Sequence, residues 1–213
     1  MLIILNNATP KPLLALAFAA ASLFAAPSYA ETDAELMASG QWRDPATGLI
    51  WMRCSIGQKW DGKTCTGEAL ELKWDDAAKY VQQFTNAGSG FAGSSNWRLP
   101  KIEELVTLRR CSKGWEQKTE SQLTPEGRRD VAIGTEYITL PNGQDVLGSC
   151  AADSSRPALD TRIFPNTPVW FYWSASPSPH SNNLAWFVDF YDGFSNLSGK
   201  YSGYYVRAVR AGQ

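Results

Sequence analysis

The chain has 213 residues, 19% of them charged, and a formal net charge of −1 at neutral pH. This balance gives no basic surface of the kind that nucleic-acid binding needs, which excludes a nucleic-acid partner. Nine tryptophans predict a core of large aromatic side chains, with one or two left exposed for stacking.

The first thirty residues predict a secretory signal peptide. Lys11 precedes an apolar run over residues 13–26, and Ser28-Tyr29-Ala30 provides small residues at positions −3 and −1 of a cleavage site. The run is too short to span a bilayer as a helix, and no cysteine follows it for lipid attachment. We therefore expect residues 31–213 to form a single exported domain, either periplasmic or at the cell surface, without a membrane span.

The four cysteines are Cys54, Cys65, Cys111 and Cys150. An even number in an exported chain favours two disulfides. Three pairings are possible, and we favour Cys54–Cys65 and Cys111–Cys150 because each bond would close a loop-like stretch. A zinc site is the alternative, but the chain has no C-x-x-C spacing and a single histidine.

The N-terminal half predicts a turn over residues 44–48, a strand over 49–52 and a helix over 72–84. The helix is indicated by one apolar face at a period of 3.6 residues, made of Trp74, Ala77, Ala78, Val81 and Phe84. Asp75 and Asp76 fall in its first turn, where the helix dipole favours acidic side chains. A catalytic acid pair is the alternative interpretation of these two residues.

A second helix is expected after Trp97-Arg98-Leu99, with Pro100 in its first turn and Ile102, Leu105 and Val106 on its buried face. Arg98 is either a buried ion-pair partner or a ligand contact, and we favour the former. Residues 113–149 form an insertion with little pattern, whose base a Cys111–Cys150 bond would close. A hairpin is predicted inside it, around the turn Asn142-Gly143.

The C-terminal region predicts three successive antiparallel strands, over residues 169–174, 184–190 and 204–209. Each is apolar on both faces, which indicates a sheet packed on both sides or one with an aromatic binding surface. The connections are rich in Tyr, Asn, Ser and Asp, a composition suited to recognition. Ordinary turn chemistry gives a similar composition and is the alternative explanation.

The order of motifs resembles the Lcl C-terminal domain family over nearly all of residues 40–210. The matching motifs are Thr47-Gly48-Leu49-Ile50-Trp51, Trp74-Asp75-Asp76-Ala77, Trp97-Arg98-Leu99-Pro100, Phe164-Pro165-Asn166-Thr167-Pro168, Tyr172-Trp173-Ser174-Ala175-Ser176, Ala185-Trp186-Phe187-Val188-Asp189-Phe190 and Tyr205-Val206-Arg207-Ala208-Val209-Arg210. The resemblance implies an α+β, C-type-lectin-like fold with two helices, small antiparallel sheets and paired N- and C-terminal strands.

The resemblance also implies ligand binding. The namesake domain belongs to a bacterial collagen-like surface adhesin that binds sulfated polysaccharides, and relatives of this fold serve as variable ligand-binding proteins. This chain has no Gly-X-Y repeat, so the trimeric display of a collagen-like protein is not implied. Because Lys11 is the one charged residue before residue 31, the mature chain is slightly acidic, which disfavours a polyanionic ligand.

We therefore predict a non-enzymatic adhesion or ligand-binding domain that recognises a glycan or a surface protein through the loops of residues 174–204. The predicted ligand-binding residues are Asn182, Asn183, Asp189, Tyr191, Asp192, Phe194, Asn196 and Tyr201. The alternatives are a cell-envelope hydrolase that uses paired carboxylates, and a structural component of a surface assembly.

No cofactor is expected. Formylglycine-generating enzymes have a related fold but depend on a cysteine pair near the C-terminal sheet, and no cysteine follows Cys150 here. His180 lies in a Pro/Ser loop without a neighbouring acid to orient it as a catalytic base. Calcium remains an alternative, because Asp189, Asp192 and Asn196 could converge as oxygen ligands.

Overall fold

The structure is a computed structural model that describes residues 31–86, 91–116, 119–124, 127–132, 146 and 148–212; for residues 84–86, 119–124 and 127–132 it describes the backbone alone. Glu31–Gln213 forms one compact unit. Its helices are α1 (Asp33–Ala38), α2 (Trp74–Asn86), α3 (Ile102–Leu105) and the 3-10 helix η1 (Val106–Leu108). Its strands are β1 (Gln41–Arg43), β2 (Ile50–Met52), β3 (Lys59–Trp60), β4 (Cys65–Thr66), β5 (Trp115–Glu116), β6 (Thr119–Thr124), β7 (Gly127–Ala132), β8 (Ser149–Cys150), β9 (Phe171–Pro177), β10 (Leu184–Asp189), β11 (Ser195–Gly199) and β12 (Val209–Arg210).

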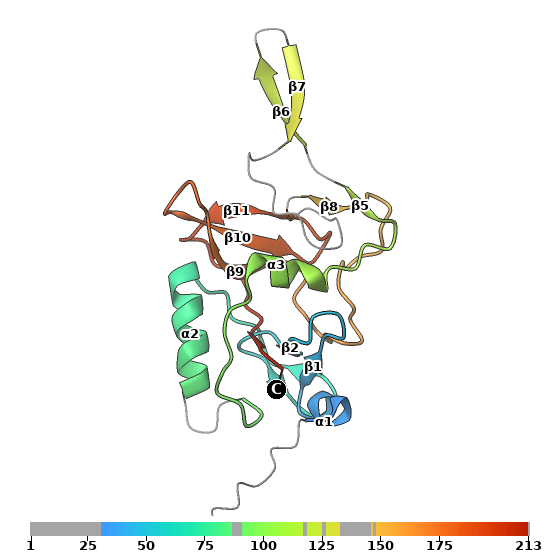
Figure 1. The fold of residues 1–213 in the computed structure, drawn as a ribbon, viewed down its shortest axis with the longest axis vertical. Helices are drawn as coiled ribbons and strands as arrows, with labels where there is room; N and C mark the ends of the chain where they lie inside the picture. The colour runs from blue at the N-terminus through green and yellow to red at the C-terminus, as the bar shows by residue number, and fades with distance from the viewer. Residues whose placement is uncertain are drawn as a thin grey trace, which may run out of the picture. The chain divides into compact units, whose positions relative to one another are not determined.

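The central sheet has the order β11-β10-β9 and is antiparallel throughout. Side chains of β10 alternate between two hydrophobic clusters, with Trp186 and Val188 in one and Ala185 and Phe187 in the other. Helix α3 contributes to the first cluster and α2 to the second, so each face of the sheet has its own helix (Figure 1). The expectation of a sheet packed on both sides is confirmed.

A second sheet has the order β1-β2-β12 and joins the two ends of the domain. In it Val209 lies opposite Trp51 and Arg210 opposite Ile50. The Arg210 guanidinium binds the Glu31 carboxylate and donates to the side-chain oxygen of Gln41. The expected pairing between N- and C-terminal strands is therefore present, with β12 next to β2 rather than at the β1 edge.

The prediction for the third C-terminal strand was wrong. Of residues 204–209, Val209 alone lies in a named strand, β12, and that strand belongs to the second sheet. The partner of β10 is β11, a segment that the sequence analysis placed in a connection. Its sequence SNLSG carries one apolar residue, and an edge strand of this kind is formed by backbone hydrogen bonds rather than by apolar patterning.

Both predicted helices are present. In α2, Ala77 and Val81 are buried and the two aspartates occupy the first turn, as expected. Helix α3 begins at Ile102, so Pro100 precedes the helix instead of lying in its first turn. Helix α3 is anchored to the sheet because the Ile102 N–H donates to Ser176 Oγ of β9 at 3.0 Å.

Arg98 is an ion-pair partner within the fold, as favoured from the sequence, but its side chain is 44% exposed rather than buried. Both of its terminal nitrogens lie 2.7 Å from the carboxylate oxygens of Glu104 in α3. The same carboxylate accepts the Lys101 N–H at 2.7 Å, which satisfies a backbone donor at the start of the helix. The pair therefore fixes the segment before α3 to the helix itself.

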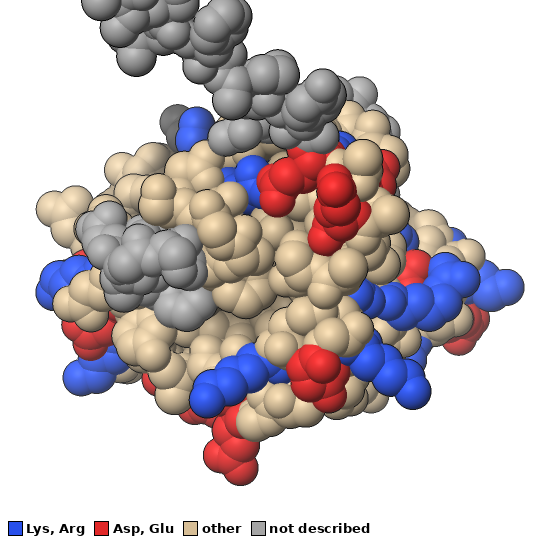
Figure 2. Space-filling model, turned by 90° about the horizontal axis from the view of Figure 1, so that it is seen from below, with Lys and Arg blue, Asp and Glu red and all other residues tan. Residues whose placement is uncertain are grey.

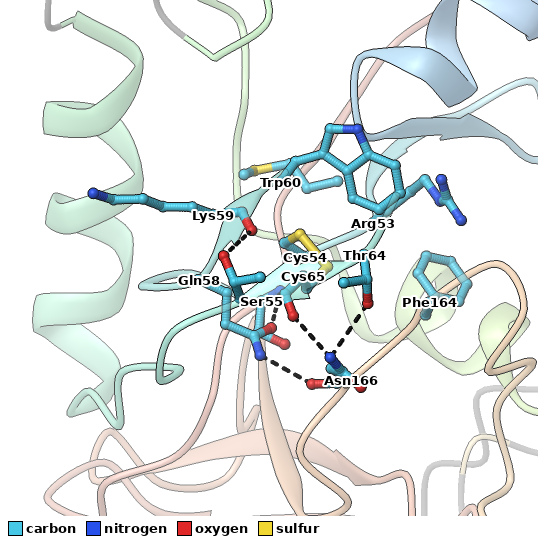
Figure 3. Close-up of a disulfide and its surroundings, with 12 residues drawn as sticks. Arg53, Cys54, Ser55, Gln58, Lys59, Trp60, Thr64, Cys65, Phe164 and Asn166 are labelled. Atoms are coloured by element: carbon cyan, nitrogen blue, oxygen red, sulfur yellow. Dashed lines mark hydrogen bonds between the residues drawn. A yellow bond between two sulfur atoms is a disulfide. The ribbon is translucent and has the colours of Figure 1, made fainter. Parts of the chain in front are cut away.

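Both disulfides follow the sequential pairing, with Cα–Cα distances of 5.4 Å for Cys54–Cys65 and 4.9 Å for Cys111–Cys150. Figure 3 shows the first bond beside Asn166, whose amide donates to Thr64 Oγ1 and to the Cys65 carbonyl. Asn166 has a φ of +51°, a left-handed conformation that Asn tolerates better than most residues. This contact ties the β3–β4 hairpin to the segment that leads into β9.

Among the residues that the structure describes between Cys111 and Cys150 there are two pairs of strands. Strands β5 and β8 pair directly beside the disulfide, with Trp115 opposite Cys150, and β6 and β7 form a hairpin. The hairpin predicted around Asn142-Gly143 lies outside the described residues. None of the helices in the described part of the chain has the length and apolar character needed to cross a membrane.

Candidate ligand-binding groove

Three of the predicted ligand-binding residues meet in one open groove, which we call the Tyr201 groove. Its volume is about 680 Å³, and its lining residues are Lys73, Asp75, Asp76, Lys79, Asn182, Asn183, Lys200 and Tyr201. Every one of these side chains except the tyrosine ring is polar or charged. The groove therefore offers hydrogen-bonding groups around a single aromatic surface.

Three segments far apart in the sequence build this groove. Lys73 and the first turns of α2 form one wall, because Trp74 and Ala77 on the opposite helix face are held in the core. The turn before β10 brings Asn182 and Asn183, and the turn after β11 brings Lys200 and Tyr201. The two turns are adjacent because Leu184 pairs with Gly199 and the Lys200 N–H donates to the Asn183 carbonyl at 2.9 Å.

Tyr201 is the most exposed of the large hydrophobic side chains in the described chain, at 80% of its full area. Its ring lies over Gly199, where a Cβ atom would stand 2.3 Å from the ring carbon Cε1. Gly199 thus leaves the space that the ring occupies. An exposed ring held against the backbone gives a preformed, flat stacking surface at the groove.

The charged groups of the groove are of both signs. The Lys200 ammonium lies 4.1 Å from the centre of the Trp74 ring, a cation–π contact that positions it at the α2 wall. Lys79 and Asp76 form an exposed ion pair at 3.8 Å, which contributes little to stability. Basic and acidic side chains are also interspersed over the face seen in Figure 2, with no large area of one sign.

Two other predicted residues, Tyr191 and Asp192, lie at the opposite end of β10. The six residues of β10 separate them from Asn183 by about 20 Å along the strand. Tyr191 is 52% exposed and carries the Arg156 guanidinium over its ring at 5.1 Å. The expectation that all these residues form one surface is therefore wrong, because β10 places its two flanking turns at opposite edges of the sheet.

Asp189 is the last residue of β10, and its side chain binds the following turn instead of serving as an exposed acceptor. Its side chain is buried, and its Oδ1 accepts the Tyr191 N–H at 2.8 Å. Burial, with a smaller contribution from the charge of Asp192, raises the pKa of the Asp189 carboxyl, although the hydrogen bond from Tyr191 acts in the opposite direction. The carboxylate of Asp192 also accepts a backbone N–H of this turn, that of Phe194 at 2.9 Å.

Phe194 directly precedes β11, and Asn196 lies within that strand. The Phe194 ring packs against the second core cluster, with its centre 6.0 Å from that of Phe187. Asn196 lies in β11 opposite Phe187, and its side-chain oxygen accepts the N–H of Leu197 at 2.7 Å. Asp189, Asp192 and Asn196 thus each use a side-chain oxygen to accept a backbone N–H.

The sequence analysis missed the lysines of the Tyr201 groove, and for Asp75 and Asp76 it favoured an interaction with the helix dipole over a catalytic acid pair. The α2 wall of the groove could have been found from the amphipathic pattern of this helix, which predicts that residues 75, 76 and 79 face away from the core. What the pattern does not contain is the long-range packing that sets this exposed helix face beside residues 182–183. Within the described residues, no group of three or more His, Cys, Asp or Glu side chains could hold a metal ion.

Two comparisons with known proteins bear on this chain. The family model described as the Lcl C-terminal domain matches residues 40–210. A search of curated proteins found no match. The matched region includes every residue of the Tyr201 groove and both disulfides.

Proposed function

Because the chain belongs to the Lcl C-terminal domain family, we propose that it is an exported, non-enzymatic domain that binds a glycan in the Tyr201 groove. In this proposal residues 1–30 are a cleaved signal peptide, and the domain has a C-type-lectin-like fold. The two disulfides support export, since such bonds form and persist in oxidising compartments.

The observation that carries the proposal is the exposed ring of Tyr201 beside the amides of Asn182 and Asn183. The C–H face of a sugar ring stacks on a flat aromatic surface, while its hydroxyl groups exchange hydrogen bonds with amides and carboxylates. The groove supplies both kinds of contact within one lining. Because the groove is open to solvent, we expect a single domain to bind weakly. Several copies that bind one polymer at the same time would bind it more tightly.

A glycan suits this lining better than a folded protein partner does. Protein interfaces are centred on a buried cluster of apolar or aromatic anchors, with charged residues depleted at the centre. In the Tyr201 groove five of the eight lining side chains are charged, and the others are two asparagines and the tyrosine. A ligand rich in hydroxyl groups matches such a surface.

Recognition also suits the groove better than hydrolysis does. The carboxylates of Asp75 and Asp76 come from consecutive residues of one helix turn, on one wall of the groove. Glycosidases place two carboxyl groups on either side of the scissile bond, separated by about 5 Å or more across the substrate. We therefore propose that these aspartates accept hydrogen bonds from ligand hydroxyls.

The test is a glycan array followed by titration calorimetry on the oxidised exported protein, with and without calcium. We expect Tyr201→Ala to weaken binding at least tenfold, about 1.4 kcal/mol, and Tyr201→Phe to retain most of the affinity. Gly199→Ala should also weaken binding, because its methyl group displaces the ring.

The matched control is Tyr191→Ala, which removes an exposed tyrosine at the other end of the sheet and should leave affinity unchanged. Thermal unfolding of each variant confirms that the fold is kept. Full binding by Tyr201→Ala would contradict the assignment of the site, and loss through Tyr191→Ala would move the site to the other edge. Binding that requires calcium would overturn the proposal of a metal-free site.

A further inference from the structure

A second open groove, here called the Tyr205 groove, is lined by residues close in sequence to those of the first: Glu71 is near Lys73, and Tyr205 is near Tyr201. Its volume is about 520 Å³, and its lining residues are Gln58, Gly67, Glu68, Ala69, Leu70, Glu71, Pro168 and Tyr205. Its two charged residues are both acidic, in contrast to the mixed charges of the Tyr201 groove. Glu71 and Tyr205 both line this groove.

The two grooves are connected by a short two-stranded ribbon. Leu72 and Tyr204 lie opposite each other in it and exchange both backbone hydrogen bonds, at 2.9 and 3.1 Å. Both of these side chains pack against the second core cluster. Because side chains alternate along extended backbone, the flanking residues Glu71, Lys73 and Tyr205 point to the other face of the ribbon.

That shared face carries one groove at each end. Glu71 and Tyr205 line the Tyr205 groove, while Lys73 lines the Tyr201 groove. Between them lies Gly203, which is exposed and presents no side chain. A Cβ built on Gly203 would meet only Glu71, at 3.5 Å and beyond, so the strip between the grooves has no side-chain wall at this residue.

We propose that the two grooves form one continuous track across Gly203, which binds a linear glycan several sugar units long. Tyr201 lies in the turn after β11 and Tyr205 follows the bridge between Leu72 and Tyr204, so the two tyrosines line different grooves. A single sugar ring stacked on Tyr201 fills one groove, whereas an oligosaccharide can extend into both. This inference rests on the proposed function and extends it from a glycan to a class of glycan.

The charges of the Tyr205 groove select among linear glycans. Glu68 and Glu71 both act on the Tyr205 hydroxyl, and after burial their negative field contributes to raising its pKa. A sulfate or carboxylate group entering this groove would be repelled, whereas a hydroxyl or a protonated amine would be attracted. The track is therefore complementary to neutral or amine-bearing sugars at its Tyr205 end.

The first experiment measures affinity against ligand length. Titration calorimetry would use linear β-1,4-linked oligomers of glucose, N-acetylglucosamine and glucosamine, from the monosaccharide to the hexasaccharide. We expect affinity to rise with length until both grooves are filled, and then to stop rising. Equal affinity for short and long oligomers would overturn the track while leaving the Tyr201 groove as a binding site.

Gly203→Phe tests the connection between the grooves directly. The φ of Gly203 lies outside the left-handed region and a Cβ there meets ordinary contacts, so the fold should accept the ring. We expect the hexasaccharide to bind the variant about tenfold or more weakly, with binding of the disaccharide unchanged. The control Ala152→Phe adds the same bulk at an exposed turn and should change neither affinity.

Glu68→Gln with Glu71→Gln tests the charge preference. Glutamine keeps most of the shape of glutamate but has no charge. The N-acetylglucosamine oligomer should therefore bind as before, while the glucosamine oligomer, whose protonated amines the two glutamates attract, should bind more weakly. Undiminished hexasaccharide binding by Gly203→Phe would overturn the track. If none of the oligomers binds and Tyr201→Ala changes nothing on the array, the proposed function itself fails, and that result differs from a failure of the track alone.

Discussion

Arg207 is a fully buried cation with no carboxylate partner among the described residues. Its guanidinium donates to the carbonyls of Met52 and Arg53 and to the hydroxyl of Thr167, and it lies 4.6 Å from the centre of the Phe164 ring. Burial lowers the pKa of the guanidinium. One side chain thus links the end of β2, the approach to β9 and the last segment of the chain.

We predict that Arg207→Met lowers the free energy of unfolding by about 3–5 kcal/mol, because two buried carbonyl groups lose their donor. Arg207→Lys should be nearly as costly, since a lysine has no planar fork to reach these acceptors together. Urea unfolding of the oxidised protein measures both. Arg162→Met is the control: this arginine is exposed and pairs locally with Asp160, so the change should stay within about 0.5 kcal/mol. A loss below 1 kcal/mol for Arg207→Met would contradict this role.

Asp189 gives a second prediction for a single residue. Its pKa is raised in the folded state, so its charged form is less favourable in the fold than in the unfolded chain. Asp189→Asn keeps an acceptor for the Tyr191 N–H and removes the charge. We expect the variant to be more stable than the native protein at neutral pH, with the difference vanishing as the pH falls below 3.8, the ordinary value for aspartate. Urea unfolding at both pH values measures this, and a variant less stable at neutral pH would contradict it.

At the scale of an element, α3 depends on the Arg98–Glu104 pair. Burial acts to raise the pKa of Glu104, but the hydrogen bonds from Arg98 and from the Lys101 N–H outweigh it, and the pKa is lowered. A lowered acid pKa stabilises the fold above the ordinary value of 4.5, and this contribution is lost as the pH falls through the folded-state value.

Glu104→Gln should therefore cost about 1 kcal/mol at neutral pH, and the difference from the native protein should shrink below pH 4.5. Chemical unfolding across this range gives the two curves. Asp153→Asn, which removes an acidic charge at an exposed turn, is the control for the loss of a carboxylate. If the free energies of unfolding of Glu104→Gln and the native protein differ by the same amount at every pH, the contribution of the Arg98–Glu104 pair to stability does not depend on pH, and the prediction is wrong.

The elements that sequence patterns predicted are those whose stability comes from apolar burial. Helix α2 buries Ala77 and Val81, and strands β2, β9 and β10 place their central apolar side chains in the two core clusters. Strand β11 was missed because it is polar and is held in the sheet by backbone pairing with β10, which leaves no apolar pattern in its own sequence. For the same reason the ligand-binding residues were grouped by sequence proximity, and the structure separates them along β10 into two edges.

At the scale of the whole molecule, two disulfides close loops of different length. The Cys111–Cys150 bond joins residues 39 apart and the Cys54–Cys65 bond residues 11 apart. In the chain-entropy model, removal by paired Cys→Ala changes costs about 4 kcal/mol for the long loop and about 3 kcal/mol for the short one. Thermal and urea unfolding of the two double variants measures the order. A larger loss from the short loop would mean that its native contacts, such as those of Asn166, depend on the bond.

Membership of the Lcl C-terminal domain family was predictable from motif order, because those motifs correspond to core-forming segments. The candidate groove was predictable only in part. Asn182, Asn183 and Tyr201 were identified from loop composition, whereas Lys73 and Lys79 enter the site through the packing of α2 beside the central sheet. Local sequence carries no information on such a juxtaposition.

The pairing of β2 with β12, together with the contact between Arg210 and Glu31, places residues 31 and 210 next to each other. A short peptide could join these two points without stretching any part of the domain. The order of the segments could then be rearranged as a circular permutant, opened for example at the exposed turn Asp61-Gly62 between β3 and β4. The domain could likewise be inserted into a surface loop of another protein, since both connections would leave from one place.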